Sequence, residues 1–257
     1  MVTPAMSKIS SSERSSSCLR TTGWWRLTDL VTEVAIGQTE RSRRLNIRHN
    51  CYTKLFRLWG YRKPILVGHS WGAALALAYT LNYPDDVSGM VLLAPAAYPD
   101  KGESRFLRFA SRPPLIGDFS LALGKPFLGR HILKQALAQA FYPQAVPNSY
   151  LKTACALWLG RRQVKAYIED ESALNNSLQR MNRRYSEIAV PVVIVTGDKD
   201  RIVSAKDNAN RLHAAVTGSQ LIELKDTGHE IPQTHPESIY SALSLISQSK
   251  NDLISMN

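Results

Sequence analysis

The sequence has few cysteines and no long apolar run, and each absence argues against a class of protein. Its 257 residues include three cysteines, Cys18, Cys51 and Cys155. An odd number at these spacings fits neither a disulfide framework nor a zinc site, so we expect a reducing, cytoplasmic environment and no bound metal. No stretch approaches the roughly 18 apolar residues of a membrane-spanning helix, so we expect no transmembrane segment.

The chain also lacks the basic and aromatic run of a nucleic-acid site, although its formal net charge is +11. The excess of Lys and Arg lies in residues 1–63 and 101–186, whereas residues 64–100 and 187–257 are mildly acidic. We therefore expect no nucleic-acid partner. Solvated surface charge explains the excess, and attraction of anionic substrates or of a membrane surface is the alternative.

The first residues lack a helical or strand period. Residues 1–22 are rich in Ser and Arg and contain one acid, Glu13, which is typical of disorder. An organellar targeting peptide is the alternative interpretation, but no apolar region of a secretory signal is present. Weak patterns then suggest a short strand at residues 30–36 and a helix at residues 50–61.

From Lys63 onward the pattern is that of an α/β protein. A buried strand at residues 65–67, a tight turn, an apolar helix at 73–81 and a second buried strand at 87–94 predict a parallel βαβ unit. Residues 101–186 have apolar and aromatic residues at helical spacing and nothing like a strand. Further strands are predicted at 190–196 and 220–224, a helix at 205–216, and a closing helix with Pro236 in its first turn.

The turn after the first buried strand reads Gly68-His69-Ser70-Trp71-Gly72. The pattern G-x-S-x-G is weak alone, but between a buried strand and a buried helix it predicts a strained turn that exposes the hydroxyl of Ser70. Glycine is needed at both flanking positions because a side chain would collide with the neighbouring strand or helix. The backbone N–H of Trp71 is the predicted oxyanion donor, and His69 is given no chemical role. An idle serine in a glycine-rich turn is the alternative.

A serine hydroxyl needs a base, and the base needs an acid that holds its tautomer. Asp198 and Asp200 follow the third predicted strand, and His229 follows the fourth. Three loops at one edge of one parallel sheet would then carry Ser, Asp and His. We prefer Asp200 as the acid and interpret Asp198 as a turn residue that bonds its own backbone. Glu230 beside the base either tunes it or is a solvated carboxylate.

These residues resemble the α/β-hydrolase superfamily, in particular its bacterial members with a helical cap, over about residues 37–246. The segments KPILVGHSWG, VSGMVLLAPAAYP, PVVIVTGDKDRIVS and LKDTGHEIPQTHPE carry the resemblance. It implies a mostly parallel sheet flanked by helices, with Ser70 as nucleophile, Asp200 as acid, His229 as base and Trp71 as oxyanion amide. It also implies core segments at residues 37–100 and 187–257, with a helical cap at residues 101–186.

The chain departs from this family at its front. The family normally begins with two or three strands and a His-Gly loop that supplies a second oxyanion amide, and the sequence has no His-Gly dipeptide. Residues 1–36 are therefore expected to be disordered or atypical, with the N-terminal strands incomplete. An unpaired sheet edge beside the Ser70 strand would then favour self-association.

The sequence thus predicts a serine hydrolase, without cofactor, that cleaves a small or apolar carboxylic ester through an acyl-enzyme at Ser70. Two alternatives remain: a truncated and catalytically impaired hydrolase-like protein, and acyl transfer or C–C hydrolysis on the same triad.

Overall fold

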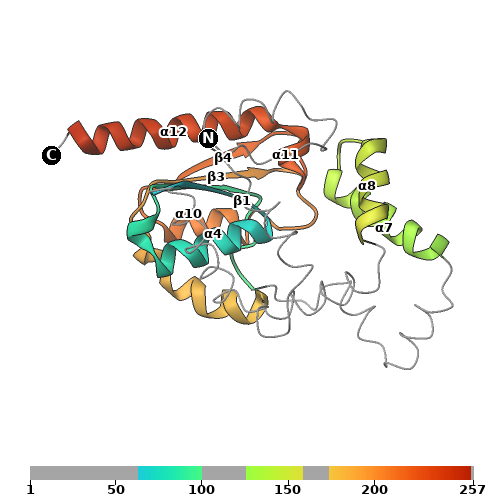
Figure 1. Cartoon of the computed structure of the whole chain (residues 1–257), viewed down its shortest axis with the longest axis horizontal. Coiled ribbons are helices and arrows are strands. Elements are labelled where there is room, and N and C mark those ends of the chain that lie inside the picture. Colours follow the sequence, from blue (N-terminus) through green and yellow to red (C-terminus); the bar gives the residue numbers. More distant parts are fainter. Residues whose placement is uncertain (1–62, 100–125, 159–173, 256–257) are drawn as a thin grey trace, which may run out of the picture.

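Four parallel strands form the centre of the protein (Figure 1). The computed structural model describes residues 63–99, 126–158 and 174–255. Within these residues the sheet has the order β1-β2-β3-β4, with the strands β1 (Ile65–His69), β2 (Gly89–Leu93), β3 (Val192–Gly197) and β4 (Gln220–Leu224). Every neighbouring pair is parallel. The carboxyl ends of all four strands therefore meet at one edge of the sheet, where α/β proteins bind ligands.

Helices cover both faces of this sheet, as Figure 1 shows. On one face lie α4 (Trp71–Asn82), which follows β1, and α10 (Ala209–Ala215), which lies between β3 and β4. On the other face lies α12 (Pro236–Ser255), which begins at the predicted Pro236 and contacts β2 and β3. The short helices η2 (Pro84–Asp86) and α11 (Ile231–Thr234) complete the connections around them.

The apolar runs of the sequence form strands because both of their faces are covered. All residues of β2 and β3 are buried, and successive side chains of a strand point to opposite faces. Met90 and Leu92 thus join the apolar cluster beneath α4, whereas Val91 and Leu93 join the cluster beneath α12. Continuous hydrophobic runs without alternation are the pattern of such doubly covered parallel strands.

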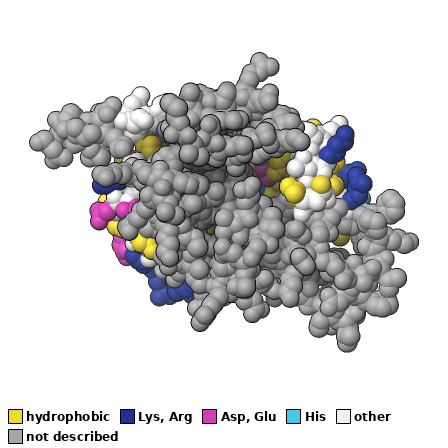
Figure 2. Space-filling model, in the orientation of Figure 1, with side chains coloured by type: hydrophobic (Ala, Val, Ile, Leu, Met, Phe, Trp, Pro, Cys, Tyr) yellow, Lys and Arg dark blue, Asp and Glu magenta, His cyan; other side chains and the backbone are white. Residues whose placement is uncertain are grey.

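The described part of the predicted cap is helical. It contains α7 (Pro126–Phe141), α8 (Asn148–Trp158), a helical segment at 174–181 and η3 (Asn182–Glu187). No strand occurs in the described residues between 126 and 187. Figure 2 shows Lys and Arg beside apolar side chains over α7 and α8, and Arg130, Lys134 and Lys152 are exposed there. The boundaries of the cap and core segments stay predictions.

Several predicted boundaries differ from the structure by a few residues. The predicted helix at 205–216 begins only at Ala209, because local side-chain bonds hold the preceding residues in turns. Ser204 Oγ donates to Asp207, and Asn208 donates to Ser204 O. Asn208 Oδ1 meanwhile accepts the N–H groups of Ala97 and Tyr98. The strand predicted at 190–196 begins at Val192, two residues late.

Several predictions concern residues outside the described ranges. These are the disordered or atypical residues 1–36, the strand at 30–36, the helix at 50–61, and the environments of Cys18 and Cys51. Cys155, on α8, is partly buried and has a free thiol. Within the described residues β1 is an edge strand, and self-association through this edge stays a prediction.

Candidate active site

Ser70 lies in a strained turn between β1 and α4. Its backbone has φ 52° and ψ −113°, a conformation that residues other than glycine rarely adopt. The turn is held in place because Ser70 N–H donates to Leu93 O at 2.9 Å, and Ala73 N–H donates to Ser70 O at 3.1 Å. Strain at this position is the geometry expected of a nucleophile that projects from the end of a strand.

Gly68 allows this turn to close, as predicted from its place in the motif. A Cβ at Gly68 would lie 2.5 Å from Gly72 O and 2.7 Å from Ala73 Cα. Only hydrogen fits there, because α4 packs directly against the end of β1. Trp71, the predicted oxyanion donor, is the first residue of α4. Backbone N–H groups in the first turn of a helix point away from the helix body and favour negative charge.

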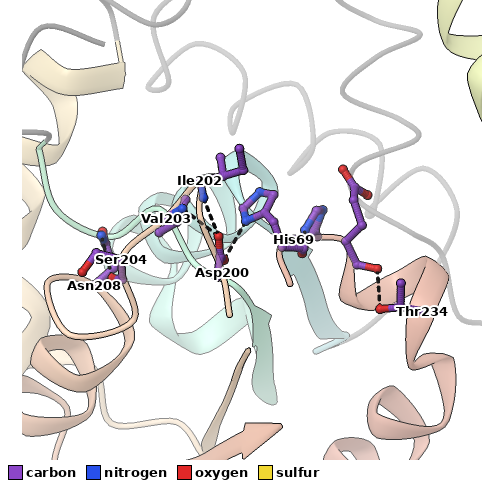
Figure 3. A network of polar contacts seen from close by, with 9 residues as sticks. His69, Asp200, Ile202, Val203, Ser204, Asn208 and Thr234 are labelled. Atoms are coloured by element: carbon purple, nitrogen blue, oxygen red, sulfur yellow. Dashed lines mark hydrogen bonds and ion pairs between the residues drawn. The ribbon is translucent and has the colours of Figure 1, made fainter. Parts of the chain in front are cut away.

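Asp200 lies in the loop after β3, and its carboxylate is completely buried. Its Oδ1 accepts the backbone N–H groups of Ile202 at 2.8 Å and Val203 at 2.9 Å (Figure 3). Its Oδ2 lies 2.8 Å from His229 Nδ1. Each oxygen of the carboxylate therefore has its own partner, and the Asp200 side chain is fixed in one orientation.

His229 lies in the loop after β4, with its side chain 6% exposed. Because a carboxylate only accepts hydrogen bonds, Nδ1 must carry the proton shared with Asp200. In the neutral ring the lone pair is then on Nε2, where a general base needs it. The main chain of His229 is fixed as well, since its N–H donates to Ala140 O at 2.9 Å and its carbonyl accepts Ile231 N–H at 2.8 Å.

The loop of the predicted base extends across the width of the sheet toward the turn of the predicted nucleophile. Two strands separate β1 from β4, which corresponds to about 14 Å at the usual strand spacing. The loop after β4 spans this distance, because His229 O lies 2.9 Å from Nε2 of His69, the residue before Ser70. In the described part of the chain no hydrogen bond joins Ser70 Oγ to His229. Such bonds often form fully only with substrate bound.

Asp198 is not the self-bonded turn residue that the sequence suggested. Its Oδ1 accepts the backbone N–H of Thr227, in the loop after β4, at 3.2 Å, and its Oδ2 lies 3.3 Å from Lys199 Nζ. Desolvation raises the pKa of the Asp198 carboxyl, but the hydrogen bonds from Thr227 and Lys199 outweigh it, so the pKa lies below its usual value. Asp198 thus joins the loop after β3 (residues 198–208), which carries the predicted acid and is here called the acid loop, to the loop after β4 (residues 225–230), here called the base loop.

The carboxyl end of α7 packs against the base loop. Ala140 O accepts the N–H groups of both His229 and Glu230, the second at 3.2 Å. A Cβ at Gly228 would lie 2.0 Å from Tyr142 O, so glycine is required for this approach. From the acid loop, Arg201 stacks over the ring of Tyr142, 3.2 Å from its centroid. The end of α7 therefore contacts both loops that carry the predicted acid and base.

The structure brings part of the predicted site together. The structure joins Asp200 to His229 by a hydrogen bond and brings the main chain of His229 to the residue before Ser70. The contacts of His69 were missed because they involve a carbonyl 160 residues away, which leaves no trace in a short motif. Among the described residues, no cluster of three or more His, Cys, Asp or Glu could hold a metal ion.

The chain belongs to the family of the α/β hydrolase fold, whose sequence profile matches residues 50–236. It is 24% identical to the uncharacterized hydrolase YugF of Bacillus subtilis, over 79% of this chain and 73% of YugF. It is also 24% identical to the monoacylglycerol lipase abhd6-A of Xenopus laevis, over 66% of this chain. That alignment spans only 50% of abhd6-A. The family and these relatives support a hydrolase enzyme.

Solved structures show the same fold. A 2-hydroxy-6-oxo-6-phenylhexa-2,4-dienoate hydrolase from Rhodococcus sp. strain RHA1 superposes with a TM-score of 0.61. It is 17% identical, over 79% of this chain and 70% of the other. Within the described residues, no helix combines the length and apolar character needed to cross a membrane.

Proposed function

We propose that the protein is a serine hydrolase that cleaves small or apolar carboxylic esters through an acyl-enzyme on Ser70. The observation that carries the proposal is the buried hydrogen bond of 2.8 Å between Asp200 and His229, formed beside a serine with positive φ. A buried carboxylate that holds imidazole in one tautomer is the arrangement that activates a serine hydroxyl.

In the proposed mechanism His229 Nε2 takes the proton of Ser70 Oγ as that oxygen attacks the ester carbonyl. The imidazolium that forms is stabilised by Asp200, and the N–H of Trp71 donates to the carbonyl oxygen as it becomes negative. His229 then gives the proton to the departing alkoxide, which leaves as the alcohol. Water, deprotonated by the same Nε2, then attacks the carbonyl of the acyl-enzyme. The bond to Ser70 Oγ breaks, His229 returns the proton to that oxygen, and the acid is released with Ser70 regenerated.

An apolar acyl or alcohol group suits the described surroundings of this site. Ile202, which donates its backbone N–H to Asp200, has 49% of its surface exposed, and Tyr142 at the end of α7 has 36% exposed. An apolar group of the substrate would find apolar contacts at these side chains. The lipase named among the relatives supports an ester substrate.

The test is steady-state hydrolysis of p-nitrophenyl esters with acyl chains of two to about twelve carbons. We expect turnover by the wild-type protein and a loss of about a million-fold in kcat for Ser70→Ala. Ser241→Ala, which changes a serine on the exposed side of α12, is the matched control and should keep full activity. Cooperative unfolding of a wild-type protein that turns over none of these esters would contradict the proposal.

A further inference from the structure

His69 joins the nucleophile turn to the main chain of the base. Its Nε2 lies 2.9 Å from His229 O, and the two imidazole rings are 4.8 Å apart between centroids, tilted by 47°. Figure 3 shows His69 beside the network around Asp200. The contact links residues 160 positions apart in the sequence. One of them, His69, is the residue that precedes Ser70.

The chemistry of this contact fixes its direction. A carbonyl oxygen can only accept, so His69 Nε2 must carry the proton and donate it. His229 O also accepts Ile231 N–H at 2.8 Å, and therefore both of its acceptor positions are used. With the bond from His229 N–H to Ala140 O, the peptide groups on both sides of His229 are held.

The sheet alone does not fix the position of His229 relative to Ser70. The ends of β1 and β4 are separated by two strands, so the relative position of Ser70 and His229 depends on how the loop after β4 is anchored. His69 is adjacent to Ser70 in the chain. A hydrogen bond from its ring to His229 O therefore fixes the distance between Ser70 and His229 directly. A misplacement of about 1 Å between reacting groups can cost about 100-fold in rate.

We propose that His69 is a positioning residue, which places Nε2 of His229 against Ser70 Oγ by anchoring the carbonyl of His229 to the nucleophile turn. The inference rests on the proposed function, because it assigns to His229 the role of base. In this role His69 acts through His229 and not on the substrate.

Two substitutions separate the hydrogen bond from the bulk of the side chain. His69→Gln keeps a nitrogen donor at about the place of ring Nε2, whereas His69→Asn keeps the amide but shortens its reach to about the place of Nδ1. His69→Leu removes the donor and keeps an apolar body. Because His229 O retains Ile231 N–H in every variant, we expect all three proteins to fold, with thermal unfolding as the check.

Steady-state kinetics with a p-nitrophenyl ester gives the first readout. We expect kcat to fall about 100-fold in His69→Leu and His69→Asn, with KM within about threefold of the wild-type value. His69→Gln should recover kcat to within about tenfold of wild type. Equal losses in His69→Gln and His69→Leu, or a His69→Leu protein with kcat within threefold of wild type, would overturn the proposal. If His69→Leu does not fold, His69→Asn replaces it in the comparison with His69→Gln.

A second readout does not depend on activity. The proton between His229 Nδ1 and Asp200 should give a far-downfield signal in the proton NMR spectrum of the wild-type protein. We expect this signal to persist in His69→Gln and to broaden or disappear in His69→Leu and His69→Asn. Unchanged signals in all variants would contradict the role of His69 even in a protein that hydrolyses no ester. Lack of turnover by the wild type would contradict only the proposed function.

Discussion

At the scale of single residues, Asp200 has the most completely determined environment. Oδ1 is occupied by two backbone N–H groups and Oδ2 by His229 Nδ1, and the side chain is inaccessible to solvent. The carboxylate therefore accepts three hydrogen bonds, all of them from groups of the protein. An acid in this position can hold one imidazole tautomer without itself taking up the proton.

This asymmetry predicts the effect of Asp200→Asn. The oxygen of the new amide must stay with the N–H groups of Ile202 and Val203, so its NH₂ group faces His229 Nδ1. Nδ1 must then accept, and the proton moves to Nε2, where the base needs its lone pair. We expect kcat for a p-nitrophenyl ester to fall about 10,000-fold while the fold is retained.

The neighbouring aspartate supplies the control for this experiment. Asp198→Asn changes a carboxylate that does not bond His229, and its amide oxygen can still accept the N–H of Thr227. Its kcat should therefore stay close to that of the wild type. Comparable losses of kcat in Asp198→Asn and Asp200→Asn would contradict the assignment of Asp200 as the acid.

The sequence predicted some of the polar contacts of this site and not others. The proximity of Asp200 to His229 was predictable because both follow apolar strands, and strand ends can be recognised from hydrophobicity. The partners of Asp198 and His69 were not found, because these side chains bond the backbone of distant loops. Backbone groups are the same at every residue and therefore leave no mark in a sequence.

At the scale of elements, several contacts join the carboxyl end of α7 to the base loop. Besides the bonds to Ala140 O, Gln144 at the end of this segment donates to Asp226 O at 2.7 Å. Gly228 lies between these contacts, and its missing Cβ makes room for Tyr142 O. The position of α7 and that of His229 are therefore set together.

Gly228→Ala tests this coupling of α7 to the base. The added methyl group would meet backbone rather than a flexible side chain, so we expect a loss of about 3 kcal/mol in the free energy of unfolding, together with a fall in kcat. Urea denaturation and ester hydrolysis measure the two effects.

A second glycine, Gly218, serves as the control, because alanine there adds backbone strain without a steric clash. Gly218 has φ 74° and nothing within 4 Å of the position of its Cβ. Gly218→Ala should cost about 1 kcal/mol, from backbone strain alone, and leave kcat unchanged. A Gly228→Ala protein as stable and as active as Gly218→Ala would show that α7 is not seated against the base loop in this way.

The order and type of the elements followed from hydrophobic runs, whereas several of their ends did not. Strand β4 has the predicted bounds, and the apolar helix after Ser70 was expected from a run without polar breaks. The predicted start of α10 was wrong because the side chains of Ser204 and Asn208 form local hydrogen bonds that hold a turn. Such competition between side chain and helix depends on distant acceptors and donors, here Ala97 and Tyr98.

At the scale of the whole molecule, the site depends on the sheet, which holds the loops after β1, β3 and β4 at one edge. Asp198 contributes to this by bonding Thr227 across the gap between the loops after β3 and β4. Its pKa in the folded protein lies below the usual value of 3.8. A carboxyl with a lowered pKa stabilises the folded state when it is ionised, so this contribution is complete above about pH 4 and is lost as the pH falls through the folded pKa.

Asp198→Asn should therefore reduce the acid sensitivity of the protein. We expect its free energy of unfolding to fall less steeply than that of the wild type between about pH 4 and pH 2, with little difference in slope above pH 5. Urea denaturation at a series of pH values measures both slopes. Parallel curves for the two proteins below pH 4 would show that the carboxyl of Asp198 has no lowered pKa.

The most direct test of the central claim is covalent labelling of the folded protein with a fluorophosphonate, followed by mass spectrometry of its peptides. A serine activated by His229 and Asp200 should react through its oxygen, and the account predicts one modified residue, Ser70. Labelling should be abolished in Ser70→Ala and strongly slowed in Asp200→Asn. A wild-type protein that is folded yet unlabelled, or that is labelled equally after Ser70→Ala, would contradict the account.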